Sequence, residues 1–133
     1  MLALVIDDSR AVRLIIGNIL REMGTEVIEA GDGREALEQL GQNPEVELVL
    51  VDWNMPVMDG LEFIRQVRSQ HCYDRVRIVM VTTETESEQV SRALRAGANE
   101  YVMKPFTREV LTDKLEWLGF STGPALSADA DVF

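Results

Sequence analysis

Carboxylate side chains follow two apolar runs of the sequence, at the point where each run ends. Asp7 and Asp8 come directly after Leu2–Ile6, and Asp52 comes directly after Leu48–Val51. If both runs are parallel strands, their carboxyl ends meet at one edge of a sheet, and the three carboxylates lie close together there. Three crowded negative charges are unfavourable unless a cation offsets their repulsion. We therefore expect a divalent metal ion at this edge.

Two further runs bring other polar groups to the same edge. Thr82 follows Ile78–Val81, and Lys104 follows Tyr101–Met103. Oxygen ligands from few side chains, which leave room for water and a phosphoryl group, are typical of magnesium rather than of zinc or a calcium cage. A single aspartate would be interpreted as an ordinary loop or helix cap. Three aspartates with a hydroxyl and an ammonium group instead favour a magnesium site that handles phosphate.

The elements that position these residues alternate along the chain. Five helical patterns are interspersed with five apolar or β-branched runs that predict strands, namely Leu2–Ile6, Glu26–Glu29, Leu48–Val51, Ile78–Val81 and Tyr101–Met103. The first, third and fourth runs stay apolar without alternation, which is typical of parallel strands covered on both faces. With right-handed crossovers, this order predicts an α/β fold with a five-stranded, doubly wound parallel sheet and helices on both faces.

The clearest helical pattern follows Ser9, which is placed to cap the helix, and ends before Gly24. Its apolar residues share the i, i+3, i+4 spacing of an amphipathic helix. They are Val12, Ile15, Ile16, Ile19, Leu20 and Met23. We expect this whole stripe to face the core.

Four other helices are predicted from shorter patterns. The second follows Asp32 and Gly33, and the third follows Gly60. The fourth begins at Thr85, which has capping-box spacing to an acidic residue three positions later, and the fifth follows Thr107. The apolar residues expected on the inner faces of these helices are Ala36, Leu37, Leu40, Leu61, Ile64, Val67, Val90, Ala93, Leu94, Leu111, Leu115 and Leu118.

The composition suits a single soluble domain. The 133 residues, 46% of them hydrophobic, can fill one core but are too few for two domains. Thirteen basic and 23 acidic residues give a net charge of −10 without a basic cluster, so direct binding to nucleic acid or to membranes is not expected. No early apolar stretch is long enough for a bilayer span, and none has the charged leader of a secretion signal. We therefore expect a cytoplasmic protein.

Five short strings at the predicted strand ends and the loops after them resemble the receiver domain of two-component response regulators, especially the single-domain regulators of chemotaxis. The strings are Val5-Ile6-Asp7-Asp8-Ser9, Asp52-Trp53-Asn54-Met55-Pro56, Met58-Asp59-Gly60, Val81-Thr82 and Lys104-Pro105-Phe106. The resemblance covers residues 1–118 and implies a flavodoxin-like strand order of 2-1-3-4-5. Residues 119–133 are small or polar and lack periodicity, so they are predicted to form a flexible C-terminal tail.

This resemblance implies that Asp52 is a phosphoacceptor, which takes its phosphoryl group from the phosphohistidine of a sensor histidine kinase. It also implies that Mg²⁺ is held by Asp8, by Asp52 and by the backbone carbonyl of Asn54, while Asp7 acts mostly through water. Phosphoryl transfer depends on positioning and charge neutralisation, which such a site can supply. The implied protein is a regulatory phosphoacceptor that assists its own phosphorylation and dephosphorylation, not an enzyme with an external substrate.

The same resemblance assigns phosphate-binding and switching roles to three residues. Lys104 would bind one phosphate oxygen and Thr82 another. Lys104 precedes Pro105, and this peptide bond is usually cis in the family. Tyr101 lies at the position of the family's aromatic switch and would turn inward when Thr82 moves, remodelling the face formed by the fourth helix, fifth strand and fifth helix. A half-buried strand tyrosine with its hydroxyl in water is the alternative interpretation of Tyr101.

Other residues near the pocket are interpreted as loop formers or as modulators of the phosphoryl lifetime. Pro56 and Gly60 indicate turns that shape the loop after the third strand. Asn54 and Glu84 flank the pocket and are expected to orient an attacking water, which predicts short-lived phosphorylation. Thr83 is bulkier than the alanine common in similar proteins, so we expect it to affect the access of small phosphodonors.

Several alternatives remain open at this point. A magnesium-dependent phosphatase of the haloacid-dehalogenase type would carry a D-x-D arrangement on its first strand, where this sequence has adjacent Asp7 and Asp8. A flavin-binding module would carry a Ser/Thr/Gly-rich phosphate loop there, and this sequence has none. No DNA-binding helix-turn-helix follows Leu118, so output through protein contact in a chemotaxis-type regulator is expected. A phosphorelay shuttle or the isolated receiver of a larger response regulator is the alternative.

Overall fold

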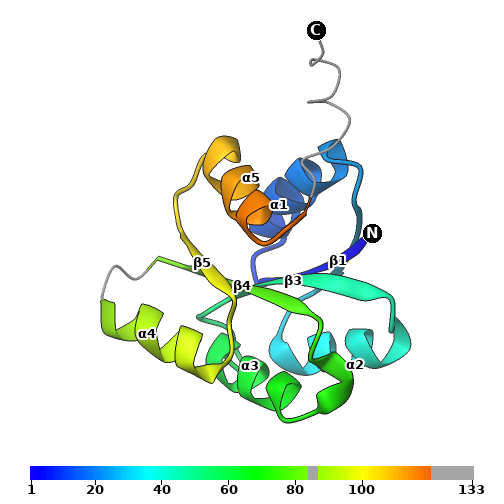
Figure 1. The fold of residues 1–133 in the computed structure, drawn as a ribbon, viewed down its shortest axis with the longest axis vertical. Coiled ribbons are helices and arrows are strands. Elements are labelled where there is room, and N and C mark those ends of the chain that lie inside the picture. Colours follow the sequence, from blue (N-terminus) through cyan, green and yellow to red (C-terminus); the bar gives the residue numbers. More distant parts are fainter. Residues whose placement is uncertain (84–86, 121–133) are drawn as a thin grey trace, which may run out of the picture.

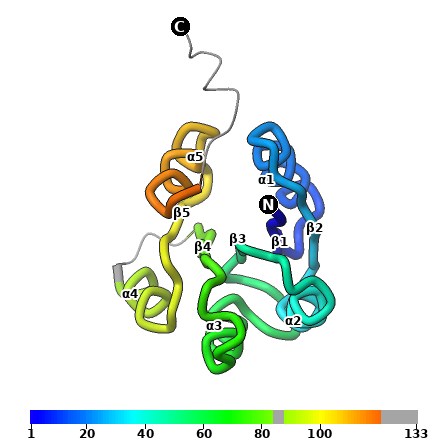
Figure 2. The backbone as a smooth tube through the Cα atoms, turned by 45° about the vertical axis from the view of Figure 1, so that its right-hand side comes forward, coloured from blue at the N-terminus to red at the C-terminus, as the bar shows by residue number. Residues whose placement is uncertain are grey.

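Five parallel strands form one sheet in the residues that the structure, a computed structural model, describes, namely 1–83 and 87–120. The strands are β1 (Leu2–Ile6), β2 (Glu26–Ala30), β3 (Val46–Asp52), β4 (Arg77–Thr82) and β5 (Glu100–Met103). Their order across the sheet is β2-β1-β3-β4-β5, and each neighbouring pair is parallel. Figure 1 labels β1, β3, β4 and β5 of this sheet, and Figure 2 labels β2 as well. The predicted doubly wound α/β fold with strand order 2-1-3-4-5 is confirmed.

Helices cover both faces of this sheet. Figure 2 shows α1 and α5 on one side of the strands and α2, α3 and α4 on the other. The helices of the described residues are α1 (Arg10–Glu22), α2 (Gly33–Gln42), α3 (Gly60–Arg68), the short 3-10 helix η1 (His71–Tyr73), α4 (Ser87–Ala96) and α5 (Arg108–Trp117). Within the described ranges, none of them combines the length and the hydrophobicity that a membrane span requires.

The three central strands are buried almost throughout, which explains their unbroken apolar sequences. β1 is buried at all five positions, β3 at six of seven and β4 at five of six. Phe63 and Ile64 of α3 belong to the core between the sheet and α2, α3 and α4. Leu20 of α1 and Leu111 of α5 belong to the core on the opposite face. Each face of the sheet therefore has its own hydrophobic layer.

Side chains cap the first turn of several helices. The predicted cap Ser9 is confirmed, because its hydroxyl oxygen lies 3.3 Å from the backbone nitrogen of Val12. The other caps seen in the described residues are Asp32, Asp59 and Thr107. The predicted cap of α4, Thr85, lies outside the described residues, as does the part of the predicted tail from 121 to 133. The described chain ends at Phe120, which packs against the core between α1 and α5.

Two apolar residues that were predicted to face the core are exposed instead. Ile15 in α1 is 57% exposed, and Leu94 in α4 is 42% exposed. Successive residues are about 100° apart around a helix, and both exposed residues are direct neighbours of buried ones, Ile16 and Ala93. The prediction was wrong at these positions because the i, i+3, i+4 spacing admits a wider stripe than the sheet covers.

Arg68, the last residue of α3, joins several segments at the edge of the sheet opposite the carboxyl ends of the strands. Its guanidinium group donates hydrogen bonds to the carbonyls of Gly97 (2.9 Å), Tyr73 (2.9 Å) and Val76 (2.7 Å). It also donates to Oδ1 of Asn99 at 2.9 Å. Gly97 has a φ of 122°, and a Cβ there would lie 2.4 Å from Cγ of Arg68. Glycine is therefore required where the α4–β5 connection meets Arg68.

Candidate functional site

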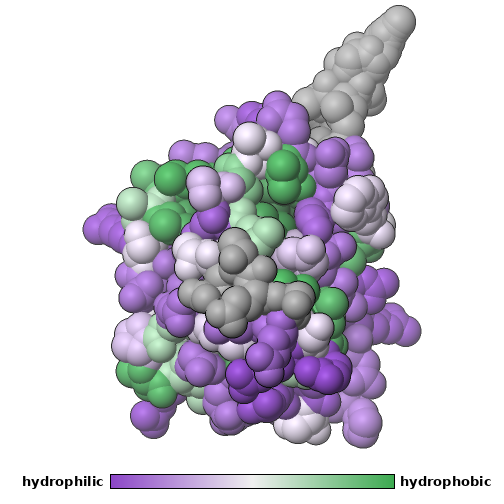
Figure 3. Space-filling view, turned by 90° about the vertical axis from the view of Figure 1, so that its left-hand side faces the viewer, coloured by the Kyte–Doolittle hydropathy of each residue, from purple (hydrophilic) through white to green (hydrophobic). Residues whose placement is uncertain are grey.

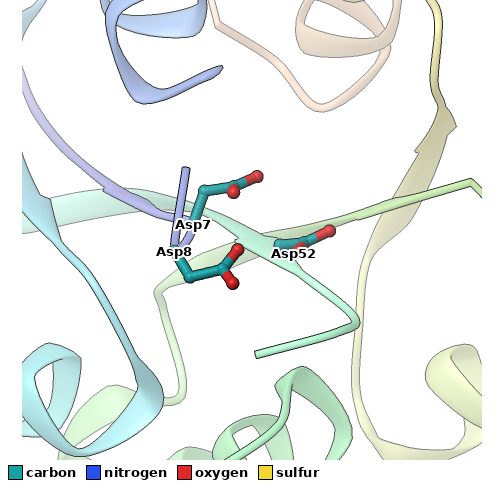
Figure 4. Close-up of side chains that lie close together, drawn as sticks. All are labelled: Asp7, Asp8 and Asp52. Carbon is teal, nitrogen blue, oxygen red and sulfur yellow. The ribbon is translucent and has the colours of Figure 1, made fainter. Parts of the chain in front are cut away.

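Three carboxylate groups meet at the carboxyl ends of β1 and β3 (Figure 4). Asp7 and Asp8 follow β1, and Asp52 is the last residue of β3. One oxygen from each of the three lies within 4.8 Å of the others. Asp7 is 1% exposed and Asp52 is 7% exposed, whereas Asp8 is exposed to solvent. The side chains that the sequence predicted to converge therefore lie together, with Asp8 at the solvent side.

Lys104, directly after β5, adds a cation to this group of carboxylates. Its Nζ lies 3.0 Å from Oδ2 of Asp7 and 3.2 Å from Oδ1 of Asp52. Its backbone N–H donates to the carbonyl of Thr82 at 2.8 Å, so the ends of β4 and β5 are joined beside the site. The peptide bond between Lys104 and Pro105 is cis, as predicted.

Burial and neighbouring charges shift the ionisation of the site. Burial raises the pKa of Asp52, and the charges of Asp7 and Asp8 raise it further, against the opposite effect of Lys104. Burial alone would lower the pKa of Lys104, but the hydrogen bonds and charges of its two carboxylate partners outweigh burial and raise it. Three carboxylates facing the ammonium of Lys104 leave an excess of negative charge. Because the donors are all oxygens, this set fits Mg²⁺.

Arg13 of α1 holds the turn that carries Asp7. Its Nη1 donates to the backbone carbonyl of Asp7 at 2.5 Å, and its Nε lies 2.9 Å from Oε1 of Glu29. Oδ1 of Asp7 accepts the backbone N–H of Ser9 at 2.8 Å. These bonds fix both the backbone and the carboxylate of Asp7. The sequence analysis missed Arg13, because nothing in its local pattern distinguishes it from a solvated charge on a helix.

The start of α3 lies against the backbone of Asp52. The N–H of Gly60 donates to the carbonyl of Trp53 at 3.0 Å, and the N–H of Trp53 donates to the carbonyl of Val81 at 3.0 Å. A Cβ on Gly60 would lie 2.4 Å from the carbonyl oxygen of Asp52. Gly60 was predicted as a turn residue, and the structure gives a steric reason for glycine at this position.

Pro56 lies in a tight turn of the same loop. Its carbonyl accepts the N–H of Met58 at 2.7 Å, which closes a three-residue turn around Val57. Val57 has a φ of 71° and is 76% exposed. A β-branched residue rarely adopts a positive φ. The loop after the third strand therefore carries backbone strain next to the carboxylates.

The remaining predicted site residues differ in exposure. Thr82 is 2% exposed at the end of β4. Asn54 and Thr83 are exposed, and Tyr101 in β5 is partly exposed. Glu84 lies outside the described residues.

Comparison with known proteins identifies the family of this chain. Residues 3–116 match the family model of the response regulator receiver domain. The chain belongs to this family. The match thus includes all five strands and both helical layers described above, apart from Leu2 of β1 and Trp117 of α5.

The receiver domain is similar to chemotaxis proteins along most of its length. It is 47% identical over 117 residues to the chemotaxis protein CheY homolog of Campylobacter jejuni, over 87% of this chain and 90% of that protein. A solved structure of the Vibrio cholerae chemotaxis protein CheY4 is 39% identical with a TM-score of 0.81, over 87% of this chain and 96% of that one. A probable two-component response regulator with a GGDEF domain is 34% identical with a TM-score of 0.83, over 88% of this chain and 48% of that one. The resemblance predicted from the five strings is confirmed.

Replacing Gly60 by alanine should destabilise the receiver domain. The added Cβ would meet the backbone of Asp52, and overpacking of this kind costs about 1–3 kcal/mol of the free energy of unfolding. Urea denaturation measures the loss. Gly41→Ala is the matched control, because a Cβ at Gly41 in α2 has no heavy atom within 4 Å. That variant should gain about 0.5–1 kcal/mol. A Gly60→Ala protein as stable as the wild type would contradict the close approach of α3.

Metal-free Asp52→Asn should melt at a higher temperature than the wild type near neutral pH. Because the pKa of Asp52 is raised in the folded state, the folded protein holds this proton more tightly than the unfolded chain. The stability that the proton contributes is present in acid and is lost as the pH rises through the folded pKa. The gain from Asp52→Asn should therefore shrink as the pH falls through the raised pKa of Asp52, and it should be absent below the ordinary carboxyl pKa, where the folded and unfolded chains both hold the proton.

Thermal denaturation with a chelator, repeated from acid to neutral pH, measures this gain. Asp113→Asn is the control, since it removes the same charge from an exposed position of α5 and should leave the melting temperature nearly unchanged. A gain from Asp52→Asn that stays constant across the pH range would be inconsistent with crowding of the carboxylates.

Proposed function

We propose that this receiver domain accepts a phosphoryl group on Asp52 from a sensor histidine kinase, in a Mg²⁺-dependent reaction, and that this modification switches its contacts with another protein. The observation that carries the proposal is the meeting of three carboxylates, within 4.8 Å of one another, with the ammonium of Lys104. So much negative charge at the strand ends requires a cation, and transfer of a phosphoryl group to a carboxylate requires one as well.

An oxygen of Asp52 acts as the nucleophile. Its bond to phosphorus forms as the phosphorus–nitrogen bond of the donor breaks, and the electron pair of that bond stays on the imidazole nitrogen. The Nζ atom of Lys104 already lies 3.2 Å from Oδ1 of Asp52. A small movement therefore allows the ammonium group to bind an oxygen of the phosphoryl group on Asp52. The ammonium group can keep its contact with Oδ2 of Asp7, now at 3.0 Å, during this movement. When bound by the three carboxylates and the carbonyl of Asn54, Mg²⁺ supplies neutralisation of charge on the phosphoryl oxygens.

Thr82 and Tyr101 connect this pocket to the surface of the domain. Tyr101 of β5 is paired with Met80 of β4. Met80 and Thr82 point to the same face because side chains alternate along a strand, so Thr82 and Tyr101 share one face of the sheet. A phosphoryl group brings about −1.5 to −2 charges and attracts the hydroxyl of Thr82. The movement of Thr82 then allows the ring of Tyr101 to turn inward.

The proposed output surface is the face formed by α4, β5 and α5. Large apolar side chains are exposed on these elements by 38–70%, and they are Leu94, Met103, Val110 and Trp117. Figure 3 views this side of the molecule, where hydrophobic side chains gather mainly in the upper half. Exposed apolar groups of this kind are typical of protein contact sites. A change in Tyr101 would alter this surface directly, because Tyr101 lies in β5.

A chemotaxis-type role is our first choice for the output. The 47% identity to a CheY homolog over nearly the whole chain supports it. A phosphorelay shuttle, or the receiver of a larger regulator, is the second candidate, and the similarity to part of a GGDEF-domain response regulator favours the latter. The net charge of −10 supports a protein that does not bind nucleic acid or membranes directly. We propose that it acts in the cytoplasm.

Three residues are proposed to set the lifetime of the phosphoryl group. Asn54 and Thr83 are exposed and follow the ends of β3 and β4, where they can orient or obstruct an attacking water. Glu84 is assigned the same role from its place in the sequence. Pro56 and Pro105 shape the loops that present Asn54 and Lys104, so we assign them positioning roles.

Incubation with Mg²⁺ and acetyl phosphate should add one phosphoryl group to the wild-type protein, as measured by intact mass. Asp52→Asn should prevent the addition, because an amide oxygen is a far weaker nucleophile than a carboxylate. Asp59→Asn is the matched control, since Asp59 caps α3 and asparagine caps helices equally well. Addition of the group to Asp52→Asn at the wild-type rate would overturn the assignment of the phosphoacceptor.

Mg²⁺ should raise the melting temperature of the unphosphorylated protein. A ligand that binds only the folded state adds about 1.4 kcal/mol to the free energy of unfolding at ten times its dissociation constant. Asp8→Ala should abolish the increase, because it removes a carboxylate from the site, whereas Asp113→Ala on the surface of α5 should preserve it. If Mg²⁺ stabilised Asp8→Ala as much as the wild type, the ion would not be held by these carboxylates.

A further inference from the structure

Lys114 of α5 lies near two aromatic rings on the proposed output face. Its Nζ is 4.3 Å from the ring centroid of Tyr101 and 5.4 Å from that of Trp117. The same nitrogen lies 3.2 Å from Oε1 of Glu100. That oxygen also accepts the backbone N–H of Tyr101 at 3.0 Å. These four residues form one contact group, which we call the Lys114 cluster.

Lys114 and Glu100 of the Lys114 cluster are largely withdrawn from water, whereas Trp117 is 70% exposed. The side chains of Lys114 and Glu100 are 17% and 20% exposed. A cation gains more from an aromatic face when both are desolvated. Tyr101 also packs against the core between the sheet and α2, α3 and α4, so its ring is in contact with the core and with the cation. With its Nζ 4.3 Å from the ring centroid, Lys114 stabilises the ring of Tyr101 in its present position.

We propose that Lys114 is a positioning residue that holds the ring of Tyr101 at the surface and thereby opposes the phosphorylation-dependent switch. The inference rests on the proposed function, because it names a residue that regulates the proposed movement of Tyr101. Glu100 and Trp117 keep the ammonium in place, so Lys114 does not follow the ring inward. The cation–ring contact therefore favours the outward ring by roughly two- to fivefold.

Fluorine NMR of the 3-fluorotyrosine-labelled chain tests this inference, because the sequence contains two tyrosines, Tyr73 and Tyr101. Tyr73 lies in η1, before the start of β4, and serves as the internal reference. The spectra are recorded with and without Mg²⁺ and beryllofluoride, a mimic of the phosphoryl group. The shift between H₂O and D₂O reports the exposure of each fluorine. Lys114→Met removes the charge and keeps an aliphatic side chain, whereas Lys114→Arg keeps the charge.

Without the mimic, Lys114→Met should reduce the solvent exposure of the Tyr101 fluorine. Lys114→Met should also lower, by about two- to fivefold, the concentration of beryllofluoride at which the Tyr101 fluorine signal has changed by half. Lys114→Arg should restore the wild-type values, and the signal of Tyr73 should not change in either variant. Identical Tyr101 exposure and identical midpoints in Lys114→Met and the wild type would overturn the inference.

A failure of the proposed function gives a different result. If Asp52 does not bind the phosphoryl mimic, beryllofluoride shifts neither fluorine signal in any variant. The comparison of Lys114→Met with the wild type in the absence of mimic still decides whether Lys114 holds the ring. General unfolding is recognised separately, because it alters the Tyr73 signal as well.

Discussion

The ammonium group of Lys104 between two buried carboxylates is the interaction on which the rest of the site depends. Its bonds of 3.0 and 3.2 Å to Asp7 and Asp52 offset part of the cost of withdrawing those charges from water. One ammonium cannot balance three carboxylates, so the folded domain retains an excess of negative charge at the strand ends. That excess provides a reason for the site to bind a divalent cation, which under the proposed function would place a second positive charge beside the carboxylate of Asp52.

The surrounding structure holds this unfavourable arrangement in place. The carboxylates follow strands that are almost entirely buried, and such burial contributes about 25 cal/mol per Å² of apolar surface. Arg13 fixes the turn after β1, and Gly60 lets α3 begin against the backbone of Asp52. The backbone positions of Asp7 and Asp52 are therefore fixed by the central strands and their contacts, and these two carboxylates stay close together. A rigid frame around repelling charges is a suitable starting state for a switch that responds to added charge.

The sequence predicts most reliably the features that have a local physical signal. Strands covered on both faces appear as unbroken apolar runs, and residues directly after such runs lie at one edge of a parallel sheet. The convergence of the carboxylates of Asp7, Asp8 and Asp52 could therefore be predicted. Periodicity shows which side of a helix faces the core, but it does not show how wide a stripe of that side the sheet covers. Ile15 and Leu94 were therefore wrongly predicted to be buried. The contacts of Arg13 and Lys114 join elements whose relative positions arise only in the folded chain.

The hydrogen bonds of Arg68 have a mechanical consequence for the domain. Its four acceptors belong to η1, to the residue before β4 and to the α4–β5 connection, at the end of the sheet far from Asp52. Sliding α4 or β5 as a whole would break several of these bonds at once, whereas tilting them about Gly97 would keep most of them. A tilt that keeps the bonds of Arg68 would have its smallest amplitude beside Arg68 and its largest amplitude at the end of the sheet that carries Asp52.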